Sequence, residues 1–490
     1  MISWSPAPLQ RMRYVTLRYG ALCYAVLLAL VLVGFDNATM LSGVLFVLLN
    51  FAIATVFVGA IRSNADSLFS DLTYAVYSLV YIFKGILLNV MGLNTAYIYV
   101  TIRTNIGPED YISALDVVTL GHALLVGLLG VLSRLPRTGF RDLRAKIYLS
   151  DRTTNLALVL LFVWIVASSV IMKIFGVAVM GTEGVSLPYK LSGVFFYSRT
   201  LIVPLLLLYF IEKSLVRQNR TLFLYTLSIF ILLIFSEVII RASKGPLLHM
   251  SLYLGVLLYL LLLRGCDARQ MISRKLIISL IAVAVVAFPL TEIYRSVVVV
   301  ADFDTSRFML GLENYMMSSS HQGGNFLVIA VERLFHRLVG FTQTAGVIAI
   351  GHSPQGLFTV LEYGSIAQYY TEGVLGYHII GHSSSPSLLG AALMLGGMQF
   401  WSLFFAPYIL LMFFVWRFSS RFANLELPMK CLLGYEIFNT IVAGTVDASL
   451  FRMSIVFSFA LFFEFFVSAV ARQKVGRPPR HARVVGHYQK

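Results

Sequence analysis

Charged residues are scarce in this chain of 490 residues, because Asp, Glu, Lys and Arg together make up only 12% of it, against 58% hydrophobic residues. Soluble globular proteins carry about 25% charged residues, so this composition excludes a soluble enzyme of the same length. A membrane helix needs about 20 apolar residues, and a dozen such helices would use roughly half of the chain. The composition therefore predicts a polytopic membrane protein without a large soluble domain.

Several chemical signatures are also missing. The three cysteines, Cys23, Cys266 and Cys431, have neither a CxxC nor a zinc-finger spacing, and the sequence contains no HExxH motif. It contains no GxxxxGK[ST] phosphate-binding loop and no GxSxG nucleophile elbow. We therefore expect no disulfide, no metal, no cofactor, no ATP hydrolysis through a phosphate-binding loop and no serine hydrolase of the common type.

Long apolar runs bounded by charged residues predict an all-α fold with about twelve transmembrane helices. The predicted spans are residues 19–35, 40–61, 72–92, 113–133, 154–178, 193–212, 221–240, 246–263, 276–298, 398–416, 431–447 and 453–471. They divide the chain into a membrane domain of about nine spans (1–298), a large outer loop carrying amphipathic helices (299–397), the last three spans (398–471) and a basic tail (472–490).

The distribution of basic residues predicts the orientation of these spans. The chain has 38 Lys and Arg against 23 Asp and Glu, and most of the basic residues lie before the first span, after the last span or in alternate connections. This asymmetry follows the positive-inside rule, so both termini are expected in the cytoplasm. The same rule accounts for the positive charge, and nucleic acid is not an expected partner. The basic tail is expected to lie near anionic lipid.

The outer loop holds one well-patterned stretch, residues 325–351. Apolar residues fall on one face of a helix there, while Glu332, Arg333, His336 and Arg337 form a narrow polar stripe on the other face. Such a helix could lie on the membrane and direct two guanidinium groups and an imidazole toward a watery cavity. The alternative is a solvated face on which Glu332 pairs with His336.

Some basic residues are predicted on the outer side of the membrane, against the positive-inside rule, so their position needs a separate explanation. Arg241 and Lys244 lie in the motif RASKGP at an outer turn, Arg295 ends a span, Arg452 follows the last outer turn, and Arg199 lies in the outer half of its span. An anionic ligand would supply a reason, because Arg binds phosphate in a bidentate way. Alternatively, these residues extend to lipid phosphates or pair with Glu237, Glu292 and Asp447.

Other ionisable residues are weaker candidates. Lys84, Lys173, Glu436 and Glu464 lie within apolar spans, mostly near predicted helix ends, where snorkelling to the interface is the simpler explanation. Asp302 and Asp304 form a DxD motif, but no companion metal ligand is evident.

With these features in place, the chain resembles the bacterial Wzy-type polymerases of O-antigen and exopolysaccharide repeat units. The resemblance lies in about twelve spans with both ends inside, in the large outer loop before the last three spans, and in two short motifs. These motifs are RASKGPLL at 241–248 and SSSPSLLGAALMLGGMQFW at 383–401. The family often has an SRG-like turn at the first place, where this chain has SKG, which keeps the charge.

The resemblance implies a glycosyltransferase in the bacterial inner membrane, with the large loop in the periplasm. A growing glycan would leave undecaprenyl pyrophosphate and join a sugar hydroxyl of a new lipid-linked repeat unit, with a flippase and a chain-length regulator as further partners. Cations would stabilise the departing pyrophosphate, and a base would deprotonate the acceptor hydroxyl. The expected pyrophosphate-binding residues are Arg241, Lys244, Arg295, Arg333, Arg337 and Arg452, and the expected bases are His336 first and His382 second.

Three other readings remain open. An O-antigen ligase would need a similar basic cavity at the outer face. A transporter or flippase of lipid-linked sugars would show charge along a central path and broken helices at the midplane. A membrane scaffold would use the loop to bind a protein partner. The placement of charge at the outer face favours the polymerase.

Overall fold

The computed structural model describes residues 7–60, 67–90, 97–99, 102–103, 106–135, 148–175, 191–241, 245–263, 291, 340–351, 357–376 and 385–475. Within these residues the chain is helical apart from a short antiparallel ribbon formed by β1 (Tyr97–Tyr99) and β2 (Ile102–Arg103). The amino-terminal half contains α1 (Ala7–Gly34), α2 (Asn37–Ala60), α3 (Ser67–Tyr77), η1 (Ser78–Phe83), α4 (Lys84–Val90), α5 (Pro108–Leu132), α6 (Asp151–Ile174), α7 (Leu191–Tyr197), η5 (Ser198–Ile202), α8 (Val203–Val216), α9 (Arg220–Arg241) and α10 (Gly245–Leu263). The carboxy-terminal half contains α14 (Gly340–Ile350), α15 (Leu357–Glu362), α16 (Ile366–Gln368), η7 (Tyr369–Val374), α17 (Leu388–Phe400), α18 (Ser402–Ser419), α19 (Glu426–Ala443) and α20 (Val446–Val475).

Eight helices within the described ranges are long and apolar enough to cross a membrane. They are Thr39–Gly59, Leu68–Val90, Pro108–Leu132, Asp151–Ile174, Leu191–Val216, Arg220–Arg241, Ser402–Ser419 and Val446–Ala469. The predicted polytopic, all-helical class is confirmed at this level. The count of about twelve stays a prediction, and the span expected at 276–298 lies outside the described residues except for Thr291.

The outer surface of the helices is apolar, as a lipid-facing surface must be. Val33, Leu41 and Phe465 are 89%, 68% and 75% exposed, on α1, α2 and α20. A water-soluble protein seldom exposes such large apolar side chains in quantity, and in a bilayer they face hydrocarbon.

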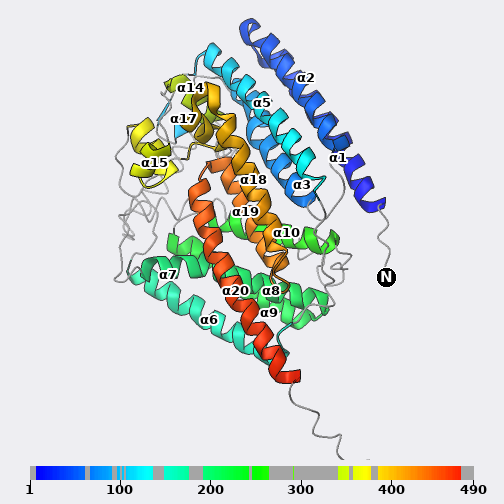
Figure 1. Ribbon diagram of the computed structural model, residues 1–490, viewed down its shortest axis with the longest axis vertical. Helices are drawn as coiled ribbons and strands as arrows, with labels where there is room; N and C mark the ends of the chain where they lie inside the picture. The colour runs from blue at the N-terminus through cyan, green and yellow to red at the C-terminus, as the bar shows by residue number, and fades with distance from the viewer. Residues whose placement is uncertain are drawn as a thin grey trace, which may run out of the picture.

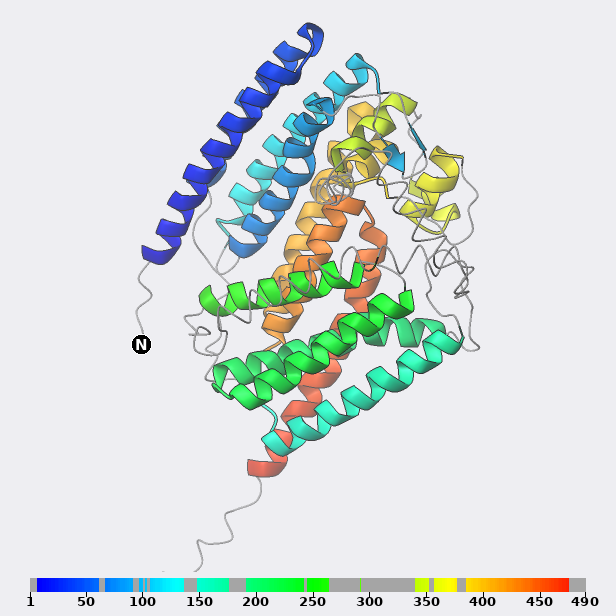
Figure 2. The same ribbon diagram turned by 180° about the vertical axis from the view of Figure 1, so that it is seen from behind.

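The helices form two groups joined by a central one. α1, α2, α3 and α5 lie together on one side and α6 to α9 lie together on another. α18 and α19 run between them, and α20 starts at the centre and passes across the second group (Figure 1, Figure 2). Helix α19 is closely enclosed, because it contacts α3, α8, α10, α14, α17, α18 and α20. Polar residues on α19 are therefore inside the bundle.

Two described helices from the predicted outer loop, α14 and α17, pack against the bundle. α14 contacts α4, α5, α17 and α19, and its residues from Gly340 to Val347 are buried. Tyr81 joins α17 to α19, because its hydroxyl donates to the carbonyl oxygen of Ile441 (3.0 Å) and accepts from the amide of Leu389 (3.1 Å). The polar stripe expected at 332–337 lies outside the described residues.

A left-handed glycine connects α19 to α20. Gly444 ends α19 with φ of 69°, a conformation that residues other than glycine rarely adopt. A Cβ atom there would also collide with the backbone carbonyl of Ser387. This tight turn brings the start of α20, including Arg452, back against the end of α19.

Candidate functional site

A group of charged and polar side chains lies where α9 ends and α10 and α20 begin, beside the middle of α19. We call it the arginine cluster. It consists of Arg199 on η5, Glu237 and Arg241 on α9, His249 on α10, Tyr435 and Glu436 on α19, and Arg452 on α20.

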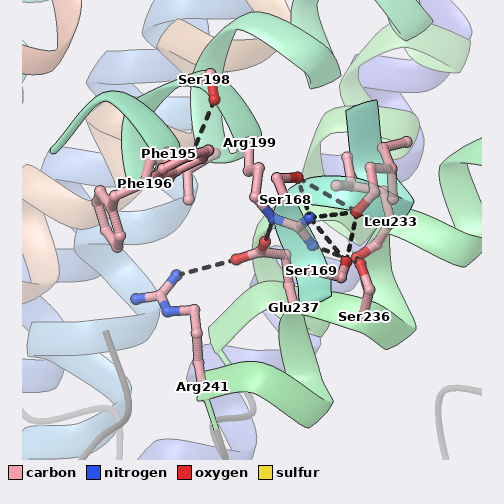
Figure 3. Close-up of polar contacts among 12 residues, drawn as sticks. Ser168, Ser169, Phe195, Phe196, Ser198, Arg199, Leu233, Ser236, Glu237 and Arg241 are labelled. Carbon is pink, nitrogen blue, oxygen red and sulfur yellow. Dashed lines mark hydrogen bonds and ion pairs between the residues drawn. The ribbon is translucent and has the colours of Figure 1, made fainter. Parts of the chain in front are cut away.

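Arg199 is fully buried, and its guanidinium group is saturated with partners (Figure 3). It lies in a π-helical turn, which widens the helix by inserting a residue and redirects the side chain. Its Nε donates to Glu237 Oε1 at 2.5 Å. Its terminal nitrogens donate to the carbonyl oxygen of Ile165 (2.8 Å) and the hydroxyls of Ser168 (2.7 Å), Ser169 (2.8 Å) and Ser236 (2.7 Å). This arginine is therefore a structural cross-link of α6, η5 and α9.

Arg241 is held more loosely. One terminal nitrogen lies 4.0 Å from Glu237 Oε2, beyond hydrogen-bonding distance, and the Nε atom is buried without a hydrogen-bond partner among the described residues. The guanidinium carbon lies 4.9 Å from the ring centroid of Phe196, which is a cation–π contact (Figure 3). The side chain is 18% exposed. Arg241 thus has donors left for another acceptor.

Arg452 forms a bidentate ion pair with Glu436. Its Nε and one terminal nitrogen donate to the two carboxylate oxygens of Glu436, each at 2.8 Å, and the same terminal nitrogen donates to Ser449 Oγ at 3.2 Å. The Glu436 side chain is buried, whereas Arg452 is 23% exposed. The pair fixes α20 against α19 and leaves an accessible edge on Arg452.

His249 and Tyr435 occupy the space beside these arginines. The Nε2 atom of His249 lies 2.5 Å from the hydroxyl of Tyr435, and the two ring centroids are 3.9 Å apart. His249 interacts electrostatically with both Arg241 and Arg452. Arg241 interacts in the same way with Tyr435 and Arg452. The two arginines and the His–Tyr pair therefore form one electrostatic unit.

The cluster, as its described residues define it, carries more positive than negative charge. Its three guanidinium groups belong to Arg199, Arg241 and Arg452, and its two carboxylates belong to Glu237 and Glu436. An unbalanced charge among apolar helices is costly unless a partner of the opposite sign arrives. The arrangement therefore suits an anion, and the exposed edges of Arg241 and Arg452 are the places where it would bind.

The sequence-based candidates can now be located. Arg241 and Arg452, which are far apart in the sequence, lie in the same cluster. Lys244, Arg295, Arg333, His336, Arg337 and His382 lie outside the described residues. Of the ion pairs considered from the sequence, the one between Arg241 and Glu237 is loose, and Arg452 pairs with Glu436 rather than with Asp447. Asp447 Oδ2 instead accepts from the backbone amide of Ile366 at 3.2 Å.

Two members of the cluster, His249 and Tyr435, were missed by the sequence analysis. Glu436 was noted there, but snorkelling was the preferred reading, and the structure shows a buried carboxylate paired with Arg452 instead. His249 lies eight residues after Arg241 in an otherwise apolar run. Because polar residues within spans are commonly functional, this histidine was a signal that could have been followed.

A second polar group lies at the opposite end of α8 and is structural. Lys213 is buried and donates to Asp151 Oδ1 and Thr154 Oγ1, each at 2.7 Å. Arg217 pairs with the same carboxylate at 3.2 Å, and Asp151 is 66% exposed. This group ties α8 to the start of α6.

No metal-binding group of three or more His, Cys, Asp or Glu residues occurs in the part of the chain that the structure describes. Comparisons of the chain with protein-family models, with curated proteins and with solved structures found no match.

Proposed function

We propose that this chain is a polymerase of lipid-linked oligosaccharide repeat units. It would transfer a growing glycan from undecaprenyl pyrophosphate to a sugar hydroxyl of a new lipid-linked repeat unit, at the outer face of the bacterial inner membrane. The observation that carries the proposal is the excess of positive charge among the described residues of the arginine cluster, and above all the loose hold on the partly exposed Arg241, whose terminal nitrogen lies 4.0 Å from Glu237.

The chemistry of the reaction matches this charge. When the bond between the anomeric carbon and the phosphate oxygen breaks, negative charge develops on a lipid pyrophosphate. Arginine side chains stabilise such charge by bidentate hydrogen bonds, and they do so strongly in a site with little water. Arg241 ends α9 and Arg452 lies in the second turn of α20, so both are near helix ends, where lipid head groups are found.

The position of the charge also favours a polymerase over a transporter. A transporter would place its binding groups near the bilayer midplane between broken helices. Of the cluster's residues, Glu237 and Arg241 lie in the last turns of α9, and His249 lies in the second turn of α10. A displacement with a single base and no covalent intermediate predicts inversion at the anomeric carbon, and linkage analysis showing retention would count against it.

The test is genetic complementation in the host. The gene is deleted and returned as the wild type or as a variant, and surface glycans are resolved on a gel. Deletion should replace a ladder with single repeat units. Arg241→Gln should fail to restore the ladder, since the loss of one transition-state donor lowers the rate by about 10²–10³-fold. The control is Arg217→Gln, which removes an arginine that follows the last residue of α8, away from the arginine cluster. This variant should restore the ladder, and both variants should be present in the membrane at equal levels.

Other outcomes assign other functions. Lipid-linked units that accumulate on the cytoplasmic side after deletion would identify a flippase. Full-length glycan that stays on its lipid and is not joined to lipid A core would identify a ligase. A normal ladder in the deletion strain would contradict the polymerase, the flippase and the ligase alike.

A further inference from the structure

The His249–Tyr435 pair in the arginine cluster joins two neutral side chains that can each give and accept a proton. The two side chains come from α10 and α19, two helices in extensive contact. Tyr435 is 8% exposed, and its hydroxyl also lies 3.5 Å from Asn439 Oδ1. The side-chain amide of Asn439 in turn donates to Thr445 Oγ1 at 3.1 Å. The tyrosine hydroxyl is therefore positioned from two sides, by an imidazole and by an amide.

We propose that Tyr435 and His249 form the proton relay that accepts the proton of the acceptor sugar hydroxyl. This inference rests on the proposed function. The acceptor hydroxyl gives its proton to the Tyr435 oxygen, while the tyrosine proton passes to His249 Nε2. The acceptor oxygen forms a bond to the anomeric carbon of the growing glycan. The bond from that carbon to the phosphate oxygen breaks, and the electron pair leaves with the lipid pyrophosphate.

The arrangement of charge supports this sequence of events. A base must lie within hydrogen-bond reach of the proton that it accepts, and the distance of 2.5 Å between Nε2 and the tyrosine oxygen meets that condition for the second transfer. The imidazolium that forms would be repelled by Arg241 and Arg452 in the empty site. A pyrophosphate bound to these arginines would offset that repulsion, so proton acceptance is coupled to the presence of the donor substrate.

A purely structural role for the pair makes a different prediction. Tyr435 packs by its ring against His249 and, edge to face, against Tyr253 at a centroid distance of 5.8 Å. Tyr435→Phe keeps these ring contacts and removes only the hydroxyl. Tyr253→Phe also removes only a tyrosine hydroxyl. Tyr253 lies one turn after His249 on α10, so this variant serves as the matched control.

The experiment measures chain growth with purified full-length protein added to membranes from the deletion host, which supply the native lipid-linked repeat units. Tyr435→Phe should lower the rate of ladder growth by about 10²–10⁴-fold, the usual contribution of acid–base catalysis, and Tyr253→Phe should not. Binding of undecaprenyl pyrophosphate, used as the probe, should stay within about twofold of the wild type for Tyr435→Phe, because the arginines are intact. A wild-type rate for Tyr435→Phe would overturn the relay.

A second measurement covers the case in which Tyr435→Phe does not fold. His249→Ala is prepared in the same way, and chain growth is followed with increasing imidazole. Recovery of the rate with imidazole, without a change in the unfolding temperature of the variant, supports the relay, because the added base then restores proton transfer and not packing. A folded His249→Ala protein that grows chains at the wild-type rate without imidazole, or that is not rescued by it, overturns the relay. If the wild type itself extends no glycan, the proposed function fails, independently of the variants.

Discussion

Arg199 and Glu237 share a hydrogen bond of 2.5 Å in which both side chains are buried, and this bond decides how Arg241 is held. The carboxylate turns one oxygen to Arg199 and leaves the other 4.0 Å from Arg241 (Figure 3). Arg241 is therefore attracted to Glu237 without being saturated by it. Arg199 is therefore structural, whereas Arg241 is available to bind an anion.

The buried pair itself should be essential for stability. Arg199→Leu leaves the Glu237 carboxylate without its main partner, and removing one member of a buried ion pair costs about 3–5 kcal/mol. Thermal unfolding in detergent should show this loss. The double variant with Glu237→Gln removes both charges and should recover part of it. Equal unfolding temperatures for the single and double variants would contradict the assignment.

Neutralising Glu237 alone should strengthen anion binding at Arg241. Charges 4 Å apart attract each other by about 4 kcal/mol at an effective dielectric constant of 20, so Glu237 competes with any anion for this arginine. Glu237→Gln should bind undecaprenyl pyrophosphate about tenfold or more tightly in a titration, if the protein remains folded. The matched variant Glu464→Gln, whose carboxylate accepts from Asn424 far from the cluster, should bind as the wild type does. Weaker binding by folded Glu237→Gln would refute the competition.

The Arg452–Glu436 pair should show strong coupling in a double-mutant cycle. Glu436→Gln and Arg452→Gln each break a bidentate contact with two distances of 2.8 Å. Each single change leaves a charge without its partner in the bundle, whereas the double change removes both, so the effects on unfolding should not add. We expect a coupling of about 1–3 kcal/mol, measured by unfolding of all four proteins. Additive effects would mean that the two side chains have no coupling energy in the folded protein.

The turn between α19 and α20 should tolerate no side chain. Gly444→Ala would place a Cβ against the Ser387 carbonyl in a residue with positive φ, and the protein should lose more than about 1 kcal/mol of stability. Gly255→Ala is the control, because Gly255 lies within α10 and no described atom lies within 4 Å of the position that the added methyl group would occupy. That change should be neutral or stabilising, since alanine favours helices by about 1 kcal/mol over glycine. Equal losses of stability in the two variants, measured by thermal unfolding, would argue against this role for the turn.

The sequence predicts the membrane helices well because apolar runs depend on local composition. α2, α5, α6 and α9 each fall close to an expected span. The packing of α14 and α17 against the bundle was not expected, because it depends on partners distant in sequence, such as Tyr81 with Leu389. Both helices are apolar, but with 11 and 13 residues they are too short to be predicted as membrane spans.

The candidate site could be predicted only in part. Arg241 and Arg452 stand out as basic residues at expected outer turns, which is a property of the sequence alone. The choice of Glu436 over Asp447 as the partner of Arg452 depends on how α19 and α20 cross, and no sequence spacing fixes that. His249 and Tyr435 are 186 positions apart in the sequence, so their hydrogen bond can be recognised only in the three-dimensional structure.

The enclosed position of α19 has a consequence for how the chain enters the bilayer. Glu426, Lys430 and Glu436 lie on this helix of 18 residues, and α19 is not among the described helices apolar enough to cross a membrane unaided. Each charged residue near a helix centre opposes insertion by about 2.5–3.5 kcal/mol. The partner of Glu436 is on α20, which is synthesised later. Glu426 and Lys430 neutralise each other within α19, so we expect the cost of burying Glu436 in lipid to fall when α19 and α20 enter together as a hairpin.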